Sequence, residues 1–254
     1  MLKNPLLRRL YELLAEPVAV LAVVFCSTTA IAQPFYVPTG SMEPTLQIGD
    51  ALIGSKFAYG YSRYSLPYGA GIATHGRLLG RLPARGDVVV FRLPRDPSQT
   101  YVKRVIGLPG DRVQMMEGKL VINSQSVPLA PAGDGLVEDS NGGFQKAAKF
   151  TETLPGGVRH AVFKMGSNLP GDDTPVFTVP AGHIFVMGDN RDNSCDSRFA
   201  PDAHYPCQGV GFVPLENLMA RADLTLGSYD FLNMHGPASW PSLVRLERFF
   251  NEII

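Results

Sequence analysis

Hydrophobic and polar positions follow two different patterns along this chain. No charged residue occurs between Glu16 and Glu43, and a continuous apolar run at residues 18–26 opens this gap. From about residue 87 onward, the apolar residues instead come in short β-branched or aromatic runs that end at Gly, Pro or Asp. A long uncharged stretch indicates a helix in a bilayer, whereas short bounded runs indicate strands. The two patterns therefore predict one N-terminal helix followed by a domain built of strands.

The uncharged stretch predicts a transmembrane helix over residues 17–36. At 1.5 Å per residue this helix would be roughly 30 Å long, which matches the hydrocarbon thickness of a bilayer. The segment before it, residues 1–16, carries the basic residues Lys3, Arg8 and Arg9. Because basic residues favour the cytoplasmic side, we expect the N-terminus in the cytoplasm and the rest of the chain outside.

A second interpretation of the same stretch stays open. Ala30-Ile31-Ala32 followed by Gln33 is also typical of the cleavage site at the end of a secretory signal peptide. Both interpretations export the remainder of the chain. Within residues 1–16, leucines recur at helical spacing beside charged residues, which favours either a helix on the bilayer surface or an extension of the span.

Strand patterns dominate the rest of the chain. They predict a mainly β fold whose core would comprise residues 37–113 and 181–226. Residues 114–180 are richer in loops and carry no chemical motif, so we interpret them as an inserted β subdomain. The runs that carry this prediction lie at residues 87–92, 101–106, 112–115, 119–122 and 183–187.

The C-terminal segment, residues 227–254, is expected to contain an amphipathic helix. Near its end, four apolar residues would fall on one helical face. Such a helix would dock on its own domain or on a bilayer, and the former is the commoner arrangement. The four residues are Leu243, Leu246, Phe250 and Ile253.

Composition narrows the classes of function. Lys plus Arg and Asp plus Glu both number 23, so the formal charge is zero and nothing drives general binding to nucleic acid. Three cysteines without C-x-x-C spacing and five histidines without H-E-x-x-H argue against a zinc site. We therefore expect neither a metal nor a cofactor. The 26 glycines and 21 prolines fit many short strands joined by turns.

Three segments combine reactive side chains with turn residues, and the first is Pro38–Leu46. Ser41 follows a glycine and lies between two prolines, a context that restrains the backbone and lets another chain approach closely. Ser41 is thus a candidate nucleophile. The alternative is an ordinary turn serine, because no G-x-S-x-G occurs and no S-x-x-K follows any serine.

The second segment runs from Tyr101 to Asp111. In a strand, Lys103 would share a face with Tyr101 and Val105 and lie among apolar groups. Burial disfavours the charged ammonium and lowers its pKa, which makes a lysine usable as a general base near neutral pH. The alternative is a lysine that extends along an exposed strand.

The third segment, Gly188–Arg198, packs Asp, Asn, Arg and Ser closely together. It suggests a calcium loop at first, but Arg191 stands two residues after Asp189, and the pattern lacks the EF-hand glycine and closing Glu. The better interpretation is a buried turn whose side chains bond to one another and to the backbone.

In this order and spacing, the three segments together resemble the bacterial type I signal peptidase (leader peptidase) family of membrane-anchored Ser/Lys endopeptidases. The resemblance also extends to residues 35–50, 56–60, 85–91 and 213–221 and covers about 100 residues. Residues 114–180 and both termini carry no matching motif. The resemblance implies an antiparallel β core with the inserted subdomain and the N-terminal transmembrane helix.

The resemblance also implies a mechanism. Ser41 would be the nucleophile and Lys103 the unprotonated base that takes its proton and returns it to the leaving amine. Ser194 would orient the lysine amine by a hydrogen bond. The oxyanion hole would use the Ser41 backbone N–H and the hydroxyl of Thr39, a position where many relatives have serine.

Further roles follow from the same resemblance. Exported preproteins would be cut after a small residue, with another small residue two before it, because shallow apolar subsites accept alanine and exclude larger side chains. The substrate would add as a strand. The expected subsite residues are Phe35, Val37, Met42, Leu46, Tyr101 and Val102. The residues expected to support the site structurally are Asp189, Asp196 and Arg198.

Cys195 is adjacent to Ser194 in the third segment, and Cys207 lies 12 positions later. Both belong to the part of the chain expected outside the membrane, where oxidation is permitted, so we expect a Cys195–Cys207 disulfide.

The expected location is the bacterial inner (cytoplasmic) membrane, with the catalytic domain on the periplasmic side and a retained anchor. The expected partners are preproteins with signal peptides, the lipid bilayer and the secretion machinery, with no nucleic acid. Two alternatives stay open: a Ser/Lys peptidase with one dedicated substrate, such as a pilus-processing enzyme or a self-cleaving repressor, and a catalytically silent scaffold on the same fold.

Overall fold

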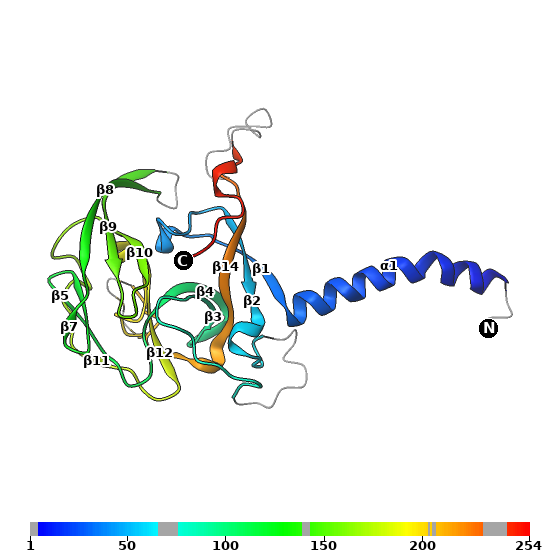
Figure 1. Cartoon of the computed structure of the whole chain (residues 1–254), viewed down its shortest axis with the longest axis horizontal. Helices are drawn as coiled ribbons and strands as arrows, with labels where there is room; N and C mark the ends of the chain where they lie inside the picture. The colour runs from blue at the N-terminus through cyan, green and yellow to red at the C-terminus, as the bar shows by residue number, and fades with distance from the viewer. Residues whose placement is uncertain (1–4, 66–75, 139–142, 203, 205–206, 231–242) are drawn as a thin grey trace.

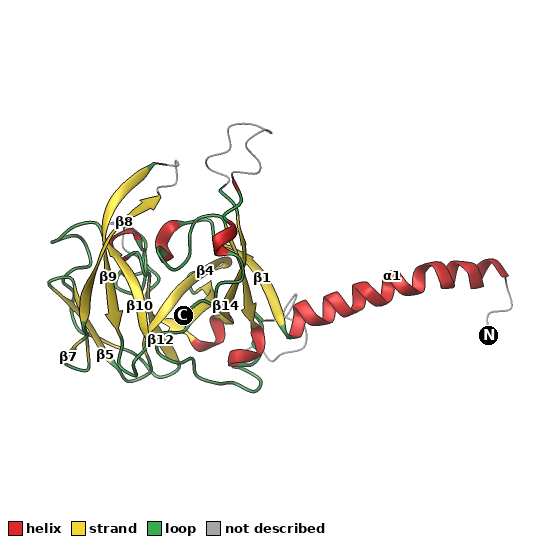
Figure 2. Cartoon of the chain, turned by 45° about the horizontal axis from the view of Figure 1, so that its top comes forward, coloured by secondary structure: helices red, strands yellow, loops and turns green. Residues whose placement is uncertain are grey.

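A large antiparallel sheet, two smaller sheets and a projecting N-terminal helix make up the chain (Figure 1). The computed structural model describes residues 5–65, 76–138, 143–202, 204, 207–230 and 243–254. In Figure 2, strands dominate the body of the molecule, and the only long helix among the described residues leaves it at one side. The fold is therefore mainly β, as the sequence predicted.

The N-terminal helix α1 spans Pro5–Ala30, and strand β1 (Ala32–Tyr36) follows it after one residue. The start at Pro5 agrees with the alternative of a helix that extends through residues 1–16, but the end of the predicted helix over 17–36 is wrong. Its last residues extend because β1 pairs along its whole length with β2 (Asp50–Ser55), from Ala32 opposite Ser55 to Tyr36 opposite Ala51. Within the helical residues that the structure describes, no helix is long and apolar enough to cross a membrane, so the predicted span is not confirmed.

The seven-stranded sheet has the order β1-β2-β14-β3-β4-β12-β13, and each neighbouring pair is antiparallel. Its central strands β3 and β4 contain most of the predicted strand run at residues 87–92 and all of the run at residues 101–106. The bounds not yet given are β3 Val88–Leu93, β4 Asp96–Gly107, β12 His183–Met187, β13 Val213–Pro214 and β14 Leu218–Ser228.

Strand β3 is buried on both faces, which explains its unbroken apolar run. Val89, Phe91 and Leu93 pack into one hydrophobic cluster with residues of β4 and β12. Val88 and Val90 point the other way and pack into a second cluster around Met42 and Leu46. Because side chains alternate across a strand, β3 separates these two parts of the core.

Two smaller sheets lie within residues 112–178, in the segment predicted to be an inserted subdomain. One has the order β11-β5-β6-β7 and the other the order β10-β9-β8. Their strands are β5 Arg112–Met116, β6 Lys119–Ile122, β7 Gln125–Ser126, β8 Leu129–Glu138, β9 Phe144–Thr153, β10 Arg159–Lys164 and β11 Phe177–Thr178. All five predicted strand runs correspond to strands of the structure.

Short 3-10 turns lie in the connections between strands and in the C-terminal segment. They are η1 Gly40–Met42, η2 Lys56–Tyr59, η4 Arg191–Asn193, η5 Leu215–Asn217 and η7 Leu246–Arg248.

The predicted C-terminal amphipathic helix is wrong for residues 243–254, while residues 231–242 lie outside the described part of the chain. The described part contains no α-helix: Leu243 and η7 are in 3-10 turns, and single bridges at Val244 and Glu252 pair it with β14 and the residue that follows β14. Leu246 and Phe250, expected on a packed face, are exposed. Backbone pairing with β14 therefore replaces the helix, since Phe250 N–H donates to Thr225 O at 2.7 Å.

Candidate active site

Two of the predicted residues are buried and in contact with each other beside the large sheet. Ser41 lies in η1, five residues after the end of β1, and Lys103 lies in β4. The Lys103 Nζ is 2.6 Å from Ser41 Oγ and 3.1 Å from the carbonyl oxygen of Val102. It also lies 5.6 Å from the centre of the Tyr101 ring, as expected for side chains on one face of a strand. The sequence thus identified a pair that is in hydrogen-bonding contact.

The environment of Lys103 favours the neutral amine. Its side chain is buried, with an exposed fraction of 4%. Burial is the main effect and lowers the pKa of Lys103 to about 8, although the carboxylates of Asp196 and Asp189 act in the opposite direction. A hydroxyl and an amine in contact, with the amine able to lose its charge near neutral pH, can perform nucleophilic catalysis.

The backbone around Ser41 is held by the loop that follows β12. Asn190 N–H donates to the Ser41 carbonyl at 3.2 Å, and its side-chain Nδ2 donates to Gly40 O at 3.0 Å. The loop approaches this closely because residue 188 is glycine: a Cβ there would lie 2.4 Å from Ser41 O and 2.3 Å from Ser194 Oγ. A side chain at position 188 would therefore force the backbone of Ser41 or the Ser194 side chain to move.

The two predicted assisting hydroxyls are placed differently. Thr39 is exposed, and its Oγ1 lies 3.5 Å from Ser41 Oγ. Ser194 is buried, and its Oγ has no hydrogen-bond partner among the described residues. The expected hydrogen bond from Ser194 to Lys103 is therefore not formed in this structure.

Apolar residues expected to form substrate subsites gather beside Ser41. Five of the six belong to one cluster, which also includes Leu52, Val88, Val90 and Ala222. Tyr101 is the exception, since it packs against the other face of β3, with its ring 6.2 Å from that of Phe91. The five that the structure brings together are Phe35, Val37, Met42, Leu46 and Val102.

A set of buried ion pairs forms the floor of the site. Arg104 makes a two-pronged contact with Asp189, with its Nε 2.8 Å from Oδ1 and its Nη2 2.6 Å from Oδ2. Arg198 does the same with Asp196 at 2.9 Å for both contacts, and Asp196 Oδ2 also accepts the Gly188 N–H at 3.0 Å. These pairs hold the pKa of both aspartates below the usual range despite their burial.

The floor also includes residues that the sequence analysis missed. Arg191 forms a buried two-pronged pair with Glu152 of β9, which ties the loop after β12 to one of the smaller sheets. His160 of β10 lies 3.4 Å from the Glu152 carboxylate, and burial lowers the pKa of His160 to about 4. Arg191 had a signal in the sequence as a member of the third segment, and Arg104 had one as the neighbour of Lys103 on the opposite face of its strand, whereas Glu152 and His160 had none.

The loop after η4 carries a disulfide between Cys195 and Cys207, the pairing that was expected. Cys195 directly follows Ser194 and precedes Asp196, so the bond lies at the edge of the ion-paired floor.

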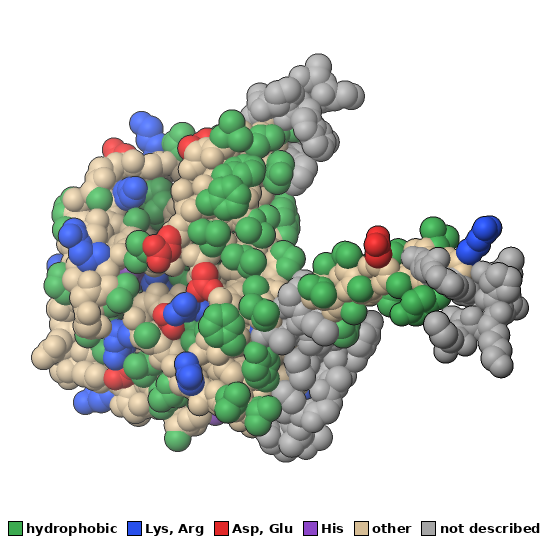
Figure 3. Space-filling model, turned by 45° about the vertical axis from the view of Figure 1, so that its right-hand side comes forward, with side chains coloured by type: hydrophobic (Ala, Val, Ile, Leu, Met, Phe, Trp, Pro, Cys, Tyr) green, Lys and Arg blue, Asp and Glu red, His purple; other side chains and the backbone are tan. Residues whose placement is uncertain are grey.

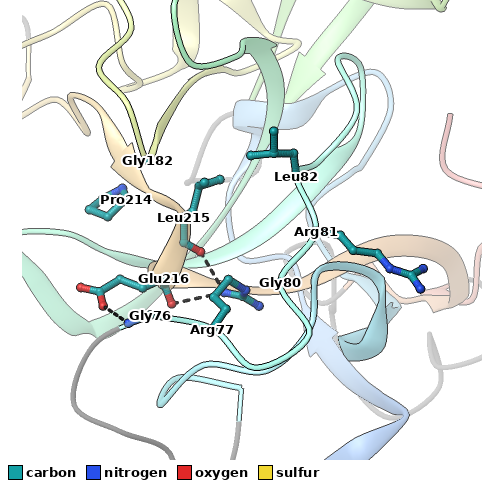
Figure 4. A pocket seen from close by; sticks show the side chains of 9 residues that line it. All are labelled: Gly76, Arg77, Gly80, Arg81, Leu82, Gly182, Pro214, Leu215 and Glu216. Atoms are coloured by element: carbon teal, nitrogen blue, oxygen red, sulfur yellow. Dashed lines mark hydrogen bonds between the residues drawn. The ribbon is translucent and has the colours of Figure 1, made fainter.

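The structure also contains a pocket of about 450 Å³ on another part of the molecule (Figure 4). None of the predicted site residues lines it. Its most buried charged group, Arg77, is already bonded to backbone, donating to Leu215 O and Leu218 O at 2.8 Å each. No group of three or more side chains suited to a metal ion occurs among the described residues.

Comparison with known proteins now places this geometry in a family. The family model described as "Signal peptidase, peptidase S26" matches residues 10–226. Signal peptidase I of Rickettsia prowazekii (strain Madrid E) is 37% identical, covering 92% of this chain and 90% of its own. Signal peptidase I of Rickettsia canadensis (strain McKiel) is 38% identical, covering 88% of this chain and 86% of its own.

Among solved structures, a signal peptidase I from Enterococcus faecalis V583 is 26% identical, covers 56% of this chain and 97% of its own, and has a TM-score of 0.31. The family model and the rickettsial relatives both extend over most of the sequence. This chain therefore belongs to the signal peptidase family, peptidase S26.

Proposed function

We propose that this serine endopeptidase removes signal peptides from exported preproteins after small residues, at sites of the Ala-x-Ala type, with Ser41 as nucleophile and Lys103 as general base. Membership of the family supports the reaction. One observation supports the residue roles above all: a buried lysine amine with a lowered pKa lies 2.6 Å from a serine hydroxyl.

In the proposed reaction, neutral Lys103 takes the proton of the Ser41 hydroxyl as Oγ attacks the scissile carbonyl. The Lys103 ammonium then gives that proton to the leaving amine, and the signal peptide stays as an ester on Ser41. Neutral Lys103 next activates a water molecule, which hydrolyses the ester and frees the serine. The Ser41 backbone N–H and the Thr39 hydroxyl are the proposed donors to the oxyanion.

The supporting residues act by position. Asp189, through Arg104, and Asp196, through Arg198, are proposed to keep the loop after β12 in place, so that Asn190 can hold the backbone of Ser41. Ser194 is proposed to orient the Lys103 amine by a hydrogen bond during the reaction, which its buried hydroxyl can offer because it has no other partner among the described residues.

Small-residue selectivity is proposed to come from the apolar cluster beside Ser41. Its members next to the nucleophile, Val37 and Met42, are almost completely buried, while Phe35 and Val102 are partly exposed. Such shallow apolar walls accept an alanine methyl group and clash with longer side chains. An extended substrate would pair with the backbone next to Phe35 and Val102.

We also propose that the enzyme works at the outer, periplasmic side of the bacterial cytoplasmic membrane. The disulfide supports this placement, because such bonds persist in oxidising compartments. Exposed apolar side chains along α1, such as Leu13, Leu21 and Val23, support its contact with lipid. In this arrangement the basic residues near the N-terminus would face the cytoplasm, and the secretion machinery would deliver the substrates.

Apolar side chains also gather where the body meets the helix (Figure 3). Ile31, Phe57, Leu78 and Leu79 are all more than half exposed. They belong to neighbouring segments, since Lys56 N–H donates to Ile31 O at 2.9 Å and Tyr61 pairs with Leu78. This surface continues the apolar character of α1 and supports a bilayer next to it.

Cleavage of a preprotein with an Ala-x-Ala site tests the proposal. Ser41→Ala and Lys103→Met should each lower kcat at least about 10³-fold, because each removes a group that makes or breaks bonds. The matched control is Lys119→Met at an exposed position of β6, which should cleave like the wild type. Substantial cleavage by either dyad variant would refute the residue roles, and a wild type that leaves the preprotein intact would refute the function.

The proposed location has its own test. In intact cells whose outer membrane has been opened, an added protease should reach the β domain but not a tag at the N-terminus. Degradation of the tag, or protection of the β domain, would contradict the arrangement.

A further inference from the structure

The described C-terminal segment, residues 243–254, lies along the second half of β14 as an additional extended chain. Arg245 N–H donates to Ser228 O at 3.1 Å, Thr225 N–H to Asn251 O at 2.9 Å, and Ile253 N–H to Asp223 O at 2.9 Å. In Figure 1 this segment, coloured red, returns from the top of β14 toward the middle of the molecule. The segment is therefore fixed to the large sheet close to its ends and its centre.

Two arginines of this segment reach the stretch of chain that follows the nucleophile. Arg245 Nη1 donates to Ile48 O at 2.7 Å, and Arg248 Nη2 donates to Thr45 O at 3.0 Å. Arg248 also donates to both carboxylate oxygens of Asp50, with Nε 2.9 Å from Oδ1 and Nη2 2.5 Å from Oδ2. Asp50 is completely buried, and its Oδ2 in turn accepts the Gln47 N–H at 2.8 Å.

This stretch is continuous with the nucleophile turn. Leu46 N–H donates to Met42 O at 3.0 Å, so the chain that carries Ser41 and the chain that Arg248 holds form one closed turn. Thr45 is bound from both sides: its hydroxyl donates to Asp189 Oδ2 at 2.5 Å, and its carbonyl accepts from Arg248. The ion-paired floor and the C-terminal segment thus hold the same loop from opposite sides.

We propose that the C-terminal segment is a clamp on the nucleophile loop, which we define as the chain from Ser41 to Asp50. Arg248 is the positioning residue of this clamp. Arg248 does not touch the reacting atoms; it acts on Ser41 through Thr45 and Asp50. This inference rests on the proposed role of Ser41 as nucleophile.

The physical reason is the tolerance of the dyad. Proton transfer between Ser41 and Lys103 needs their heavy atoms within hydrogen-bond reach, and a misplacement of about 1 Å can lower a rate about 100-fold. A planar guanidinium that binds both oxygens of a buried carboxylate and a backbone carbonyl fixes the loop in distance and in orientation. The clamp should therefore act on the chemical step rather than on substrate binding.

The test compares Arg248→Ala with Arg221→Ala, a matched control on β14. Arg221 also pairs with a carboxylate, at 2.6 Å from Asp223, but that pair is partly exposed and makes no contact with the nucleophile loop. We expect Arg248→Ala to lower kcat for a preprotein about 10- to 100-fold with KM nearly unchanged. The rate at which a small serine-directed acylating reagent modifies Ser41 should fall by the same factor. Arg221→Ala should match the wild type in both.

Arg248→Lys provides a second, milder variant. A lysine can reach Asp50 or Thr45 O but cannot make the two-pronged contact, so kcat should lie between those of wild type and Arg248→Ala. If Arg248→Ala does not fold, Arg248→Lys decides alone by its kcat at a temperature well below its Tm.

Two results would overturn the clamp. One is a kcat and an acylation rate for the folded Arg248 variants equal to those of Arg221→Ala. The other is a loss that follows only the folded fraction of the protein. Failure of the wild type and of Arg221→Ala to cleave would instead count against the proposed function, so the two failures are distinguishable.

Discussion

The two faces of β4 surround two neighbouring cationic side chains, Lys103 and Arg104, with opposite environments. Lys103 lies on one face in contact with a hydroxyl, a carbonyl and an aromatic ring, and no carboxylate of the described residues lies within hydrogen-bonding distance of its amine. Arg104, the next residue, lies on the other face and is bound by Asp189, Thr45 and the carbonyl of Gly86. Both side chains are buried.

The difference separates reactivity from rigidity. A buried lysine without a carboxylate in contact loses its charge easily, which suits a base, whereas a buried arginine keeps its charge and uses it to hold other groups in place. We call the face with Lys103 the reactive face and the face with Arg104 the ion-paired face. The reactive face can do without ion pairs because the ion-paired face supplies the rigidity. Three experiments test this division, in order of decreasing effect.

Breaking the ion-paired face should cost the most stability. Asp189→Ala leaves the guanidinium of Arg104 buried without its carboxylate and should lower the free energy of unfolding by about 3–5 kcal/mol. Urea unfolding measures this change. Arg221→Ala, which removes a partly exposed ion pair, should cost no more than about 1 kcal/mol. Equal losses in the two variants would mean that burial does not distinguish the ion-paired face.

Removing a hydrogen-bond donor next to the reactive face, near Ser41, should reduce activity without changing the free energy of unfolding. Thr39→Val keeps the shape of an exposed residue but removes its hydroxyl, so we expect kcat to fall about 10²- to 10³-fold with an unchanged Tm. Thr39→Ser retains the hydroxyl and is the matched control, with activity close to wild type. Wild-type turnover by Thr39→Val would remove Thr39 from the mechanism.

The pH dependence of kcat should report the charge of Lys103. Because burial lowers the pKa of Lys103 to about 8 and only the neutral amine accepts a proton, kcat should rise about tenfold per pH unit below pH 8 and level off above it. A pH–rate profile between pH 6 and 10 measures this directly. A midpoint near 10.5, the ordinary value for lysine, would show that the reactive face does not disfavour the charge.

The same linkage gives the sign of the effect on stability. The folded chain holds Lys103 with a lower pKa than the unfolded chain, so between about pH 8 and 10.5 the unfolded state binds more protons. The contribution of Lys103 to stability therefore increases as pH rises through this window, and below pH 8 the buried ammonium carries its full cost.

The sequence identified what depends on local pattern. Strands with β-branched runs, such as Val88–Leu93, were predictable because both of their faces are buried. Local sequence marked Ser41 and Lys103 only as candidates, beside the alternatives of a turn serine and an exposed lysine. The family resemblance then joined segments that lie far apart in the chain.

What the sequence did not reveal depends on contacts between distant segments. Glu152 has no local feature that distinguishes it from an exposed glutamate, and only the fold brings it to Arg191. The C-terminal residues have helical spacing, yet pairing with β14 makes them extended. The end of α1 was misplaced for the same reason, since β2 offers hydrogen bonds that draw residues 32–36 into the sheet.

The single residue between α1 and the large sheet has a consequence for how the molecule can turn. Ile31 is the whole connection, its carbonyl is bonded to Lys56, and β1 is paired from its first residue. A long flexible linker would let the β domain rotate freely about its attachment. Here β1 connects α1 directly with the chain that leads to Ser41, so the orientation of the helix and that of the Ser41 turn depend on the same paired strand.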